Sequence, residues 1–140
     1  MPSLIVTDAP DETDRAAVLD GLTAFNLAET GGTAPVPLAV LIKDARGTTT
    51  GGLIGRTWLE WLYVELVYVP DALRGTGIGR ELMVRAEAEA RARGCRGIWL
   101  NTFSFQARGF YEKLGFELCG RIDDYPPGHG RFFLQKRLDR

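Results

Sequence analysis

A run of alternating glycines lies in the middle of the chain, in the segment Arg74-Gly75-Thr76-Gly77-Ile78-Gly79. It stands between an apolar run, residues 61–69, and an amphipathic pattern that begins at Ile78. Because glycines lack a Cβ atom, backbone N–H groups can converge there on a phosphate, and the start of a helix adds unpaired donors and a positive dipole end. The segment therefore predicts a pyrophosphate-binding turn between a strand and a helix.

The spacing of these glycines separates the turn from two other phosphate-binding loops. The chain has no G-x-x-x-x-G-K-[ST] motif, which disfavours Mg²⁺-dependent phosphoryl transfer. The pattern is G-x-G-x-G rather than the G-x-G-x-x-G of dinucleotide-binding turns. A turn that only packs a helix closely against a strand is the simpler interpretation, but Arg74 directly before the glycines favours an anion site.

The N-terminal third combines a strand pattern with a helix pattern. Leu4 to Val6 is a short apolar run that predicts a strand, and Asp11 or Thr13 can cap the helix that follows. A loop rich in glycine and proline, residues 31–37, leads to the next strands and could shape a pocket. The helix is expected to bury apolar residues spaced by three and four, namely Val18, Leu19, Leu22 and Phe25.

The rest of the chain alternates strands and helices around the glycine turn. Residues 38–42 and 52–58 predict an antiparallel hairpin, and residues 61–69 predict the central strand of the sheet, which stops at Pro70. Ile78 to Arg93 predicts a helix ended by Gly94. The elements expected after it are a strand at 97–103, a short helix at 107–114 and a strand pair at 116–122 and 131–138. This order indicates a mixed α/β fold.

Length and charge bound the class of protein. The chain has 140 residues, a length typical of one domain, so we expect a single domain over residues 1–140. Its 17 basic and 18 acidic residues give a net charge of -1, which argues against a nucleic-acid or membrane partner. Cys95 and Cys119 have no neighbours at metal-ligand spacing, so no metal is expected. No leader or membrane-spanning pattern occurs, which favours the cytoplasm.

Two motifs together resemble the GNAT N-acetyltransferase superfamily. Its phosphate-binding signature is Arg or Gln, two residues, Gly, one residue, then Gly or Ala, and Arg74, Gly77 and Gly79 match it. The segment 104–116 resembles the family's second cofactor motif, which ends in Tyr-x-x-x-Gly-Phe. The resemblance covers nearly the whole chain and implies a mixed, mostly antiparallel sheet of about seven strands with helices on both faces. The Asp-Tyr-Pro-Pro-Gly-His loop at 124–129 further resembles a bacterial subgroup of this family.

The resemblance implies that acetyl-CoA is the acetyl donor and that it lies in a V-shaped gap between the central strand and the next parallel one. Main-chain groups of residues 67–69 would pair with the pantetheine arm, and amides of residues 74–79 would hold the pyrophosphate. Many members have Asn seven residues before the motif tyrosine, where this chain has Ser104, whose shorter hydroxyl could reach the cofactor through water or not at all. The expected cofactor-binding residues are Val67, Tyr68, Val69, Arg74, Gly75, Thr76, Gly77, Ile78, Gly79 and Ser104.

Acyl transfer from a thioester to an amine needs a base, because an alkylamine titrates near ~10.4, as lysine does, and must lose a proton at neutral pH. By the two-residue period of a strand, Trp61, Tyr63, Glu65, Val67 and Val69 share one face. This period places Glu65 next to the pantetheine-pairing stretch, as the candidate base. An ion-paired surface carboxylate is the alternative interpretation of Glu65.

The transfer also needs an acid and an oxyanion donor. Tyr111 fits the acid by its motif position, because a phenol near ~10 can protonate a thiolate near ~8.5; it could equally be a half-buried aromatic that packs the short helix. A backbone N–H near Val67 would stabilise the oxyanion. His129, the one histidine, is an alternative base, although it could equally hydrogen-bond within its own turn.

These observations favour an acetyl-CoA-dependent N-acetyltransferase that acetylates a primary amine of a small molecule or an exposed amino group of a peptide, by direct attack in a ternary complex. A non-catalytic CoA-binding sensor or interaction module is the alternative, because the same glycine turn would serve it. A toxin that acetylates aminoacyl-tRNA would need a basic face, which the net charge of -1 disfavours. The sequence leaves open the acceptor, the choice of Glu65, His129 or a water relay as base, and whether two copies form a homodimer.

Overall fold

The computed structural model describes residues 1–140, which divide into two compact units, residues 1–34 and 35–140. The first unit contains one helix, α1 (Glu12–Thr30), and residues 1–10 form neither strand nor helix. The strand predicted over Leu4 to Val6 is therefore wrong. A three-residue apolar run has no strand in this unit with which to complete its backbone hydrogen bonds. The single domain predicted over residues 1–140 stays a prediction.

Helix α1 begins at a capping box and ends at a glycine. Asp11 Oδ1 accepts a hydrogen bond from the Asp14 N–H at 2.8 Å, and Asp14 Oδ2 accepts one from the Asp11 N–H at 3.1 Å, so the prediction of Asp11 as the cap is confirmed. Gly31 ends the helix in the left-handed conformation. The helix has no buried residue, because this unit holds no second element against which its apolar stripe can pack. The burial predicted for Val18, Leu19, Leu22 and Phe25 is therefore absent from this unit.

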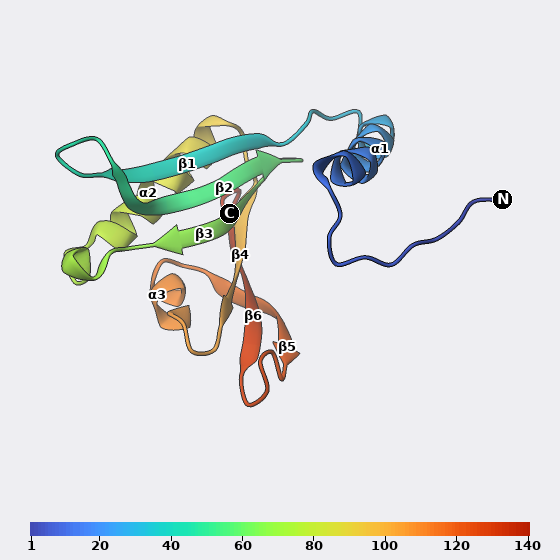
Figure 1. Ribbon diagram of the computed structural model, residues 1–140. Coiled ribbons are helices and arrows are strands. Elements are labelled where there is room, and N and C mark those ends of the chain that lie inside the picture. Colours follow the sequence, from blue (N-terminus) through green and yellow to red (C-terminus); the bar gives the residue numbers. More distant parts are fainter. The chain divides into compact units, whose positions relative to one another are not determined.

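The second unit is built on one six-stranded sheet with the order β1-β2-β3-β4-β6-β5 (Figure 1). Its strands are β1 (Val36–Lys43), β2 (Thr49–Trp58), β3 (Trp61–Tyr68), β4 (Gly97–Phe103), β5 (Glu117–Asp123) and β6 (Gly130–Arg137). Its helices are η1 (Asp71–Leu73), α2 (Ile78–Ala92) and α3 (Arg108–Lys113). Only the β3–β4 pair is parallel. The predicted mixed sheet is confirmed, with six strands rather than about seven because residues 4–6 are not a strand.

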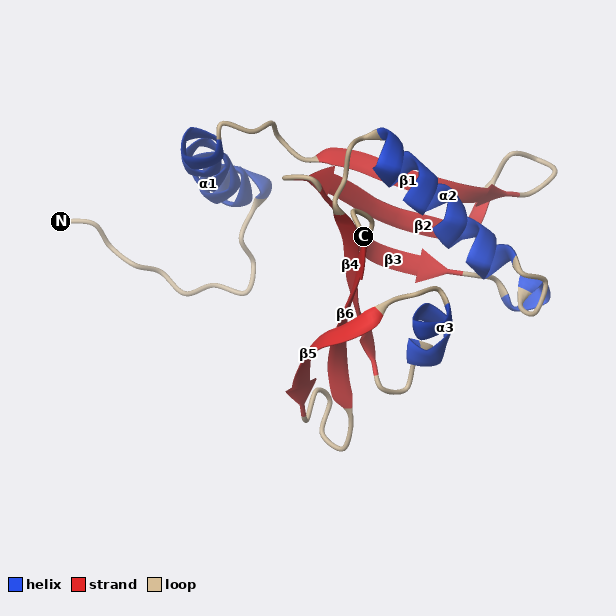
Figure 2. Ribbon diagram, turned by 180° about the vertical axis from the view of Figure 1, so that it is seen from behind, coloured by secondary structure: helices blue, strands red, loops and turns tan.

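Helix α2 covers one face of the sheet at β1 and β2 (Figure 2). Its apolar residues recur every three or four positions, and this stripe is buried against side chains that alternate along the strands. The residues of α2 that are buried there are Leu82, Met83, Ala86 and Ala90. Because Leu53 and Leu62 on the facing strands are fully buried as well, the core lies between α2 and this face of the sheet.

Strand β3 contains a β-bulge at Glu65. Val64 pairs with Gly55 and Leu66 pairs with Ile54, so Glu65 has no opposite residue on β2. A Cβ atom on Gly55 would collide with the Tyr63 carbonyl oxygen, which explains why glycine stands opposite the bulge.

The bulge corrects the prediction that alternate residues from Trp61 to Val69 share one face. Val67 pairs with Leu53, which is fully buried, and both Val67 and Val69 pack against the core. Tyr63 lies on the opposite face, away from the buried Leu62 and Val64. The extra residue therefore shifts the alternation of side chains by one position after Glu65.

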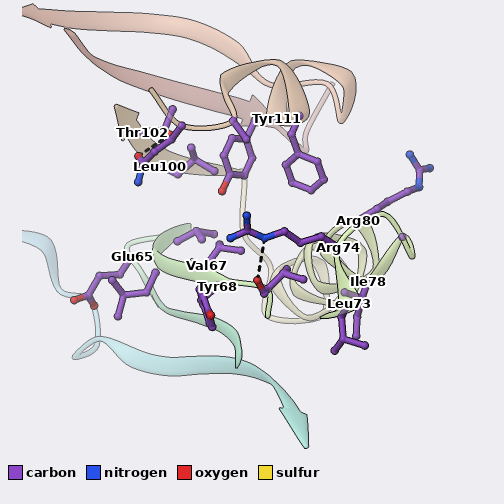
Figure 3. A pocket seen from close by; sticks show the side chains of 18 of the residues that line it. Glu65, Val67, Tyr68, Leu73, Arg74, Ile78, Arg80, Leu100, Thr102 and Tyr111 are labelled. Carbon is purple, nitrogen blue, oxygen red and sulfur yellow. Dashed lines mark hydrogen bonds between the residues drawn. The ribbon is translucent and has the colours of Figure 1, made fainter. Parts of the chain in front are cut away.

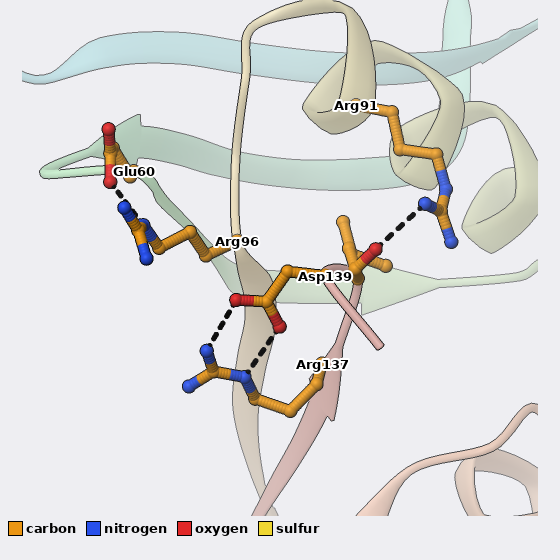
Figure 4. A network of polar contacts seen from close by, with 6 residues as sticks. Glu60, Arg91, Arg96, Arg137 and Asp139 are labelled. Atoms are coloured by element: carbon orange, nitrogen blue, oxygen red, sulfur yellow. Dashed lines mark hydrogen bonds and ion pairs between the residues drawn. The ribbon is translucent and has the colours of Figure 1, made fainter.

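Strands β3 and β4 are joined at one end and separate at the other. They pair from Trp61–Gly97 to Val64–Leu100 and then diverge, with α3 in the angle between them in both views (Figures 1 and 2). The joined end is tied by a polar network (Figure 4). In it, the Arg96 N–H donates to the Glu60 carbonyl and Arg96 Nε pairs with Glu60 Oε2, both at 2.6 Å. The sheet therefore opens as a V toward the glycine turn.

Candidate active site

A groove of about 920 Å³ lies in the opening of the V (Figure 3). One wall is residues 64–68 of β3 with Val69 after it, and the other is residues 100–102 of β4 with residues 105–107 of the loop that follows. The glycine turn and the start of α2 form one end, and Phe110 and Tyr111 of α3 also line the groove. The structure therefore brings both predicted cofactor motifs to one cavity.

The start of α2 leaves several amides without acceptors. Gly77, the N-cap, is left-handed and provides no side chain to cap the helix, in contrast to the capping box of α1. The N–H groups of Gly77, Ile78, Gly79 and Arg80 have no acceptor within the protein, because the first intrahelical bond runs from the Glu81 N–H to the Gly77 carbonyl. Free amides at the positive end of a helix dipole are suited to bind an anion.

The left-handed conformation of the turn explains two of its glycines. Gly75 and Gly77 have φ angles of 77° and 86°, and a Cβ atom on either would point into open space. Gly79 has ordinary helical geometry, and a Cβ atom there would touch Phe110 and Val69 only at normal contact distance. The turn therefore has room beside it for a ligand that approaches the backbone closely.

Two arginines flank this turn. Arg74 is exposed, and its Nε lies 3.3 Å from Asp71 Oδ1 and 3.4 Å from the Val69 carbonyl oxygen, a contact drawn in Figure 3. Arg80 lines the groove and is also exposed, but no carboxylate lies within ion-pair distance of it. Arg80 was not among the residues predicted from the sequence, and an unpaired guanidinium at this end adds positive potential to the free amides.

Strand β3 offers its backbone to the groove. Beyond Val64 the strand has no partner on the β4 side, so residues 66–68 pair with β2 alone and the bulged Glu65 has no opposite residue on either strand. An extended ligand could pair with this free edge as an additional strand would. Val67, Tyr68 and Val69, predicted for this role, all line the groove.

Glu65 lines the groove at the bulge but is half-exposed. Its Oε2 atom lies 3.7 Å from Arg56 Nη1, and Figure 3 shows its carboxylate turned away from the Tyr111 hydroxyl. Glu65 thus lies at the free edge of β3, as expected for the candidate base. It is also ion-paired, as expected for the alternative, a surface carboxylate. An exposed ion pair of this length contributes little to stability.

Tyr111 is held by aromatic packing, and its hydroxyl points toward β3 (Figure 3). Its ring contacts Phe110 and Phe116 edge-on, with centroids 5.1 Å and 5.9 Å apart. Burial raises the pKa of the Tyr111 phenol above its ordinary value, because the phenolate would lose its hydration. The side chain therefore remains protonated at neutral pH and faces the groove as a hydrogen-bond donor.

Two of the predicted cofactor residues, Thr76 and Ser104, do not line the groove. Thr76 Oγ1 donates to the Leu73 carbonyl at 2.5 Å, within the turn itself. Ser104 Oγ accepts from the Gly130 N–H at 3.1 Å and lies 3.1 Å from His129 Nδ1. Ser104 therefore ties the β4–α3 loop to the start of β6, and His129 is engaged in the same contact rather than directed into the groove.

Several lining residues were not predicted from the sequence. Apart from Arg80, these include Asn101 and Thr102 on β4 and Phe105 and Gln106 after it. Gln106 Oε1 accepts from Thr102 Oγ1 at 3.0 Å and from the Phe103 N–H at 2.7 Å, which fixes the loop at the end of β4. The signal that could have indicated Asn101 and Thr102 is that they are the two polar residues in a strand that is otherwise apolar.

A model of the GNAT acetyltransferase family matches residues 10–116, which include the glycine turn and most of the groove. The chain belongs to this family and is an acetyltransferase. An acetyltransferase of Agrobacterium fabrum is 38% identical over 97% of this chain and 99% of its own length. A protein of Agrobacterium tumefaciens, known from a crystal structure, is 37% identical over 98% of this chain and all of its own length, with a TM-score of 0.93.

Two further proteins are similar to this chain, one in sequence and one in fold, and their descriptions say what they act on or bind. The blasticidin-S acetyltransferase of Streptomyces morookaense is 46% identical over 66% of this chain and 69% of its own length. A Bacillus anthracis protein crystallised with acetyl coenzyme A has the same fold, with a TM-score of 0.62 and 22% identity over 76% of this chain and 64% of its own length.

In the structure of the present chain, no helix is long and apolar enough to cross a membrane.

Proposed function

We propose that this acetyltransferase transfers the acetyl group of acetyl-CoA to a primary amine, either of a small molecule or at an exposed amino group of a peptide, by direct attack in a ternary complex. The observation that carries the proposal is the set of unsatisfied amides of residues 77–80 at the end of a groove between two diverging strands. The blasticidin-S acetyltransferase among its relatives supports a small-molecule acceptor.

The residues present fit coenzyme A. The free amides and Arg80 supply donors and positive charge for the diphosphate, with Arg74 beside them, and the open space at Gly75 and Gly77 lets it approach the backbone. The unpaired edge of residues 65–68 offers donors and acceptors to the amides of the pantetheine arm. Bound in this way, acetyl-CoA would supply the acetyl group as a thioester. The complex of the Bacillus anthracis protein with acetyl coenzyme A supports this donor.

Two side chains would move protons. Glu65 would take the proton that the acceptor ammonium must lose, directly or through water, and its position beside the free edge of β3 suits this role. Tyr111 would protonate the leaving thiolate, since its phenol is neutral and points toward β3. A backbone N–H of the bulged segment near Val67 would stabilise the oxyanion. His129 is held by Ser104, which favours Glu65 over it as the base.

The test is a thiol-release assay with acetyl-CoA and a panel of aminoglycosides, polyamines, amino acids, peptides and blasticidin S. We expect release of free thiol that depends on one class of amine and yields the acetylated amine by mass spectrometry. Calorimetry with CoA measures binding separately. Binding of CoA without turnover for any amine would instead support the non-catalytic module, and no binding at millimolar CoA would refute the proposed site.

A further inference from the structure

Most arginines of this protein are neutralised by a nearby carboxylate. The arginines with no carboxylate within ion-pair distance are Arg15, Arg46, Arg80, Arg131 and Arg140. All of these are exposed except Arg131, on β6, which is half-buried. A half-buried guanidinium without a counter-charge is costly unless neutral acceptors or a ligand satisfy it.

Arg131 is held rigidly by neutral groups. Its Nε and Nη2 both donate to Asn101 Oδ1, at 2.8 Å and 2.5 Å, and Nη1 donates to the Tyr125 hydroxyl at 2.9 Å. The guanidinium also stacks on the rings of Phe103 and Tyr125, about 5 Å from each centroid. A guanidinium has five N–H donors, so one N–H on each terminal nitrogen is left without a protein acceptor.

The loop that carries Asp-Tyr-Pro-Pro-Gly-His provides this support. Tyr125 contributes the hydroxyl and one of the stacking rings, and its ring lies 5.4 Å from that of Phe103. At the other end of the loop, His129 contacts Ser104 and packs edge-on against Phe105, which lines the groove. The loop therefore fastens Arg131 to the β4–α3 segment, a role that the proposed acetyl transfer does not otherwise assign to it.

Arg131 lies on the side of the sheet away from the glycine turn. On β4, Ile98 and Leu100 belong to the core and Thr102 is buried on the same face, so Asn101 belongs to the opposite face. Phe103 pairs with Arg131, so both residues share this face. Asn101 lines the β4 wall of the groove and accepts from Arg131, so the guanidinium adjoins the groove through Asn101.

The geometry points to Arg131 as the binding site for a carboxylate of the acceptor. This inference rests on the proposed function, and it makes the acceptor an amine that also bears a carboxylate, as an amino acid does. Arginine binds planar carboxylates through two parallel N–H donors, and the two terminal nitrogens each keep one donor free. With its carboxylate on Arg131, such a molecule could direct its amino group into the groove past Asn101, toward Glu65 and the free edge of β3.

The test compares acceptors that differ only in the carboxylate, namely L-lysine with cadaverine and L-phenylalanine with phenethylamine. We expect the wild-type protein to acetylate the carboxylate-bearing member of at least one pair with the higher kcat/KM. In Arg131→Gln, KM for that amino acid should rise about tenfold or more, while KM for the matched amine and KM for acetyl-CoA stay unchanged. In Arg131→Lys, KM for the amino acid should lie between the values of the wild-type protein and of Arg131→Gln, because lysine keeps the charge but not the planar pair of donors.

Two further variants separate this role from a loss of structure. Tyr125→Phe removes only the hydroxyl that Arg131 contacts, and it should raise KM for the amino acid and not for the amine. Arg121→Gln is the matched control, because Arg121 is an exposed arginine of β5 paired with Asp123, and it should change neither constant. Melting temperature and CoA affinity show whether each variant is folded.

Three results would overturn the inference while leaving the proposed function intact. The wild-type protein could acetylate amines with no preference for a carboxylate, or acetylate only acceptors that lack one. Alternatively, Arg131→Gln could weaken both members of a pair equally although the variant is folded and binds CoA. Failure to acetylate any amine at all would refute the proposed function, and this inference with it.

Discussion

Tyr111 keeps its proton because α3 places its ring among Phe110 and Phe116 while its hydroxyl faces the groove. Burial raises the pKa of this phenol above its ordinary value, so the proton is present at neutral pH. This arrangement suits a hydroxyl that donates one proton per turnover and then takes up another from solvent.

We expect Tyr111→Phe to lower kcat about a hundredfold, with little change in KM for acetyl-CoA, because it removes one hydroxyl and leaves the ring contacts in place. Tyr68→Phe is the matched control, since Tyr68 also lines the groove and has an exposed phenol. Steady-state kinetics of both variants provide the test. An unchanged kcat in Tyr111→Phe would remove Tyr111 from the mechanism.

Substitution of Glu65 tests the base. We expect Glu65→Gln to lower kcat/KM by about a hundredfold at neutral pH and to abolish the acidic limb of the rate profile, because an amide cannot accept the acceptor's proton. Glu81→Gln is the control, since Glu81 is another exposed glutamate paired with an arginine, on α2. If the limb persists in Glu65→Gln and disappears in His129→Gln, the base is His129.

At the scale of elements, the uncapped start of α2 is the feature on which binding depends. Gly77 and Gly47 have nearly the same φ, 86° and 81°, and neither has an atom within 4 Å of an added Cβ. Alanine at either position should therefore cost a similar free energy of unfolding, about 1 to 2 kcal/mol. Only Gly77→Ala adds a methyl group beside the free amides.

We accordingly expect Gly77→Ala to weaken CoA binding about tenfold and Gly47→Ala to leave it unchanged, measured by calorimetry at matched stability. Equal CoA affinity in the two variants would show that the backbone at residue 77 does not contact the diphosphate. A loss in both would show that the effect follows stability rather than the site.

The elements that the sequence predicts correctly are those with local signals. The β1–β2 hairpin has an Asp44 side chain that accepts from the Arg46 and Thr48 N–H groups, and α2 has an apolar stripe and a terminal glycine. The run at Leu4 to Val6 has no such support and forms no strand. The bulge at Glu65 breaks the assumed period, and Gly55, on another strand, is the one residue whose type reflects it.

The scale of the whole molecule explains what sequence reasoning missed at the site. The motif residues Arg74, Gly77 and Tyr111 line the groove. They could be predicted because each lies in a local sequence motif. Arg131 approaches Asn101 only because β6 inserts next to β4, ahead of β5, so residues thirty positions apart meet through sheet order. Ser104 contacts Gly130 for the same reason, and a local motif comparison has no access to such contacts.

Buried titratable groups of the second unit link global stability to alkaline pH. Burial raises the pKa of Tyr111 and of the Cys95 thiol above their ordinary values of 10.0 and 9.0. The folded state therefore holds these protons more tightly than the unfolded state does. The stability that they contribute is complete below pH 9 and is lost as pH rises through the raised values.

We expect the free energy of unfolding to fall as pH rises above 9, and to fall less steeply in Tyr111→Phe and in Cys95→Ala than in the wild-type protein. Urea denaturation between pH 8 and the alkaline limit of folding measures these slopes. Parallel curves for the wild-type protein and both variants would show that neither group is shielded from water in the folded state.

The extra residue in β3 changes which of the following side chains of that strand face the core. A substitution at Glu65 keeps the bulge, whereas deleting the residue would leave a regular strand whose side chains alternate strictly between the two faces. After the deletion, Leu66 and Val67 would still lie opposite Ile54 and Leu53, so Val67 would stay in the core and the ladder between β2 and β3 would have no bulge. A strand that kept Glu65 in a regular ladder would instead turn Val67 out of the core, so the bulge is what allows the chain to carry a carboxylate beside the groove while Val67 stays buried.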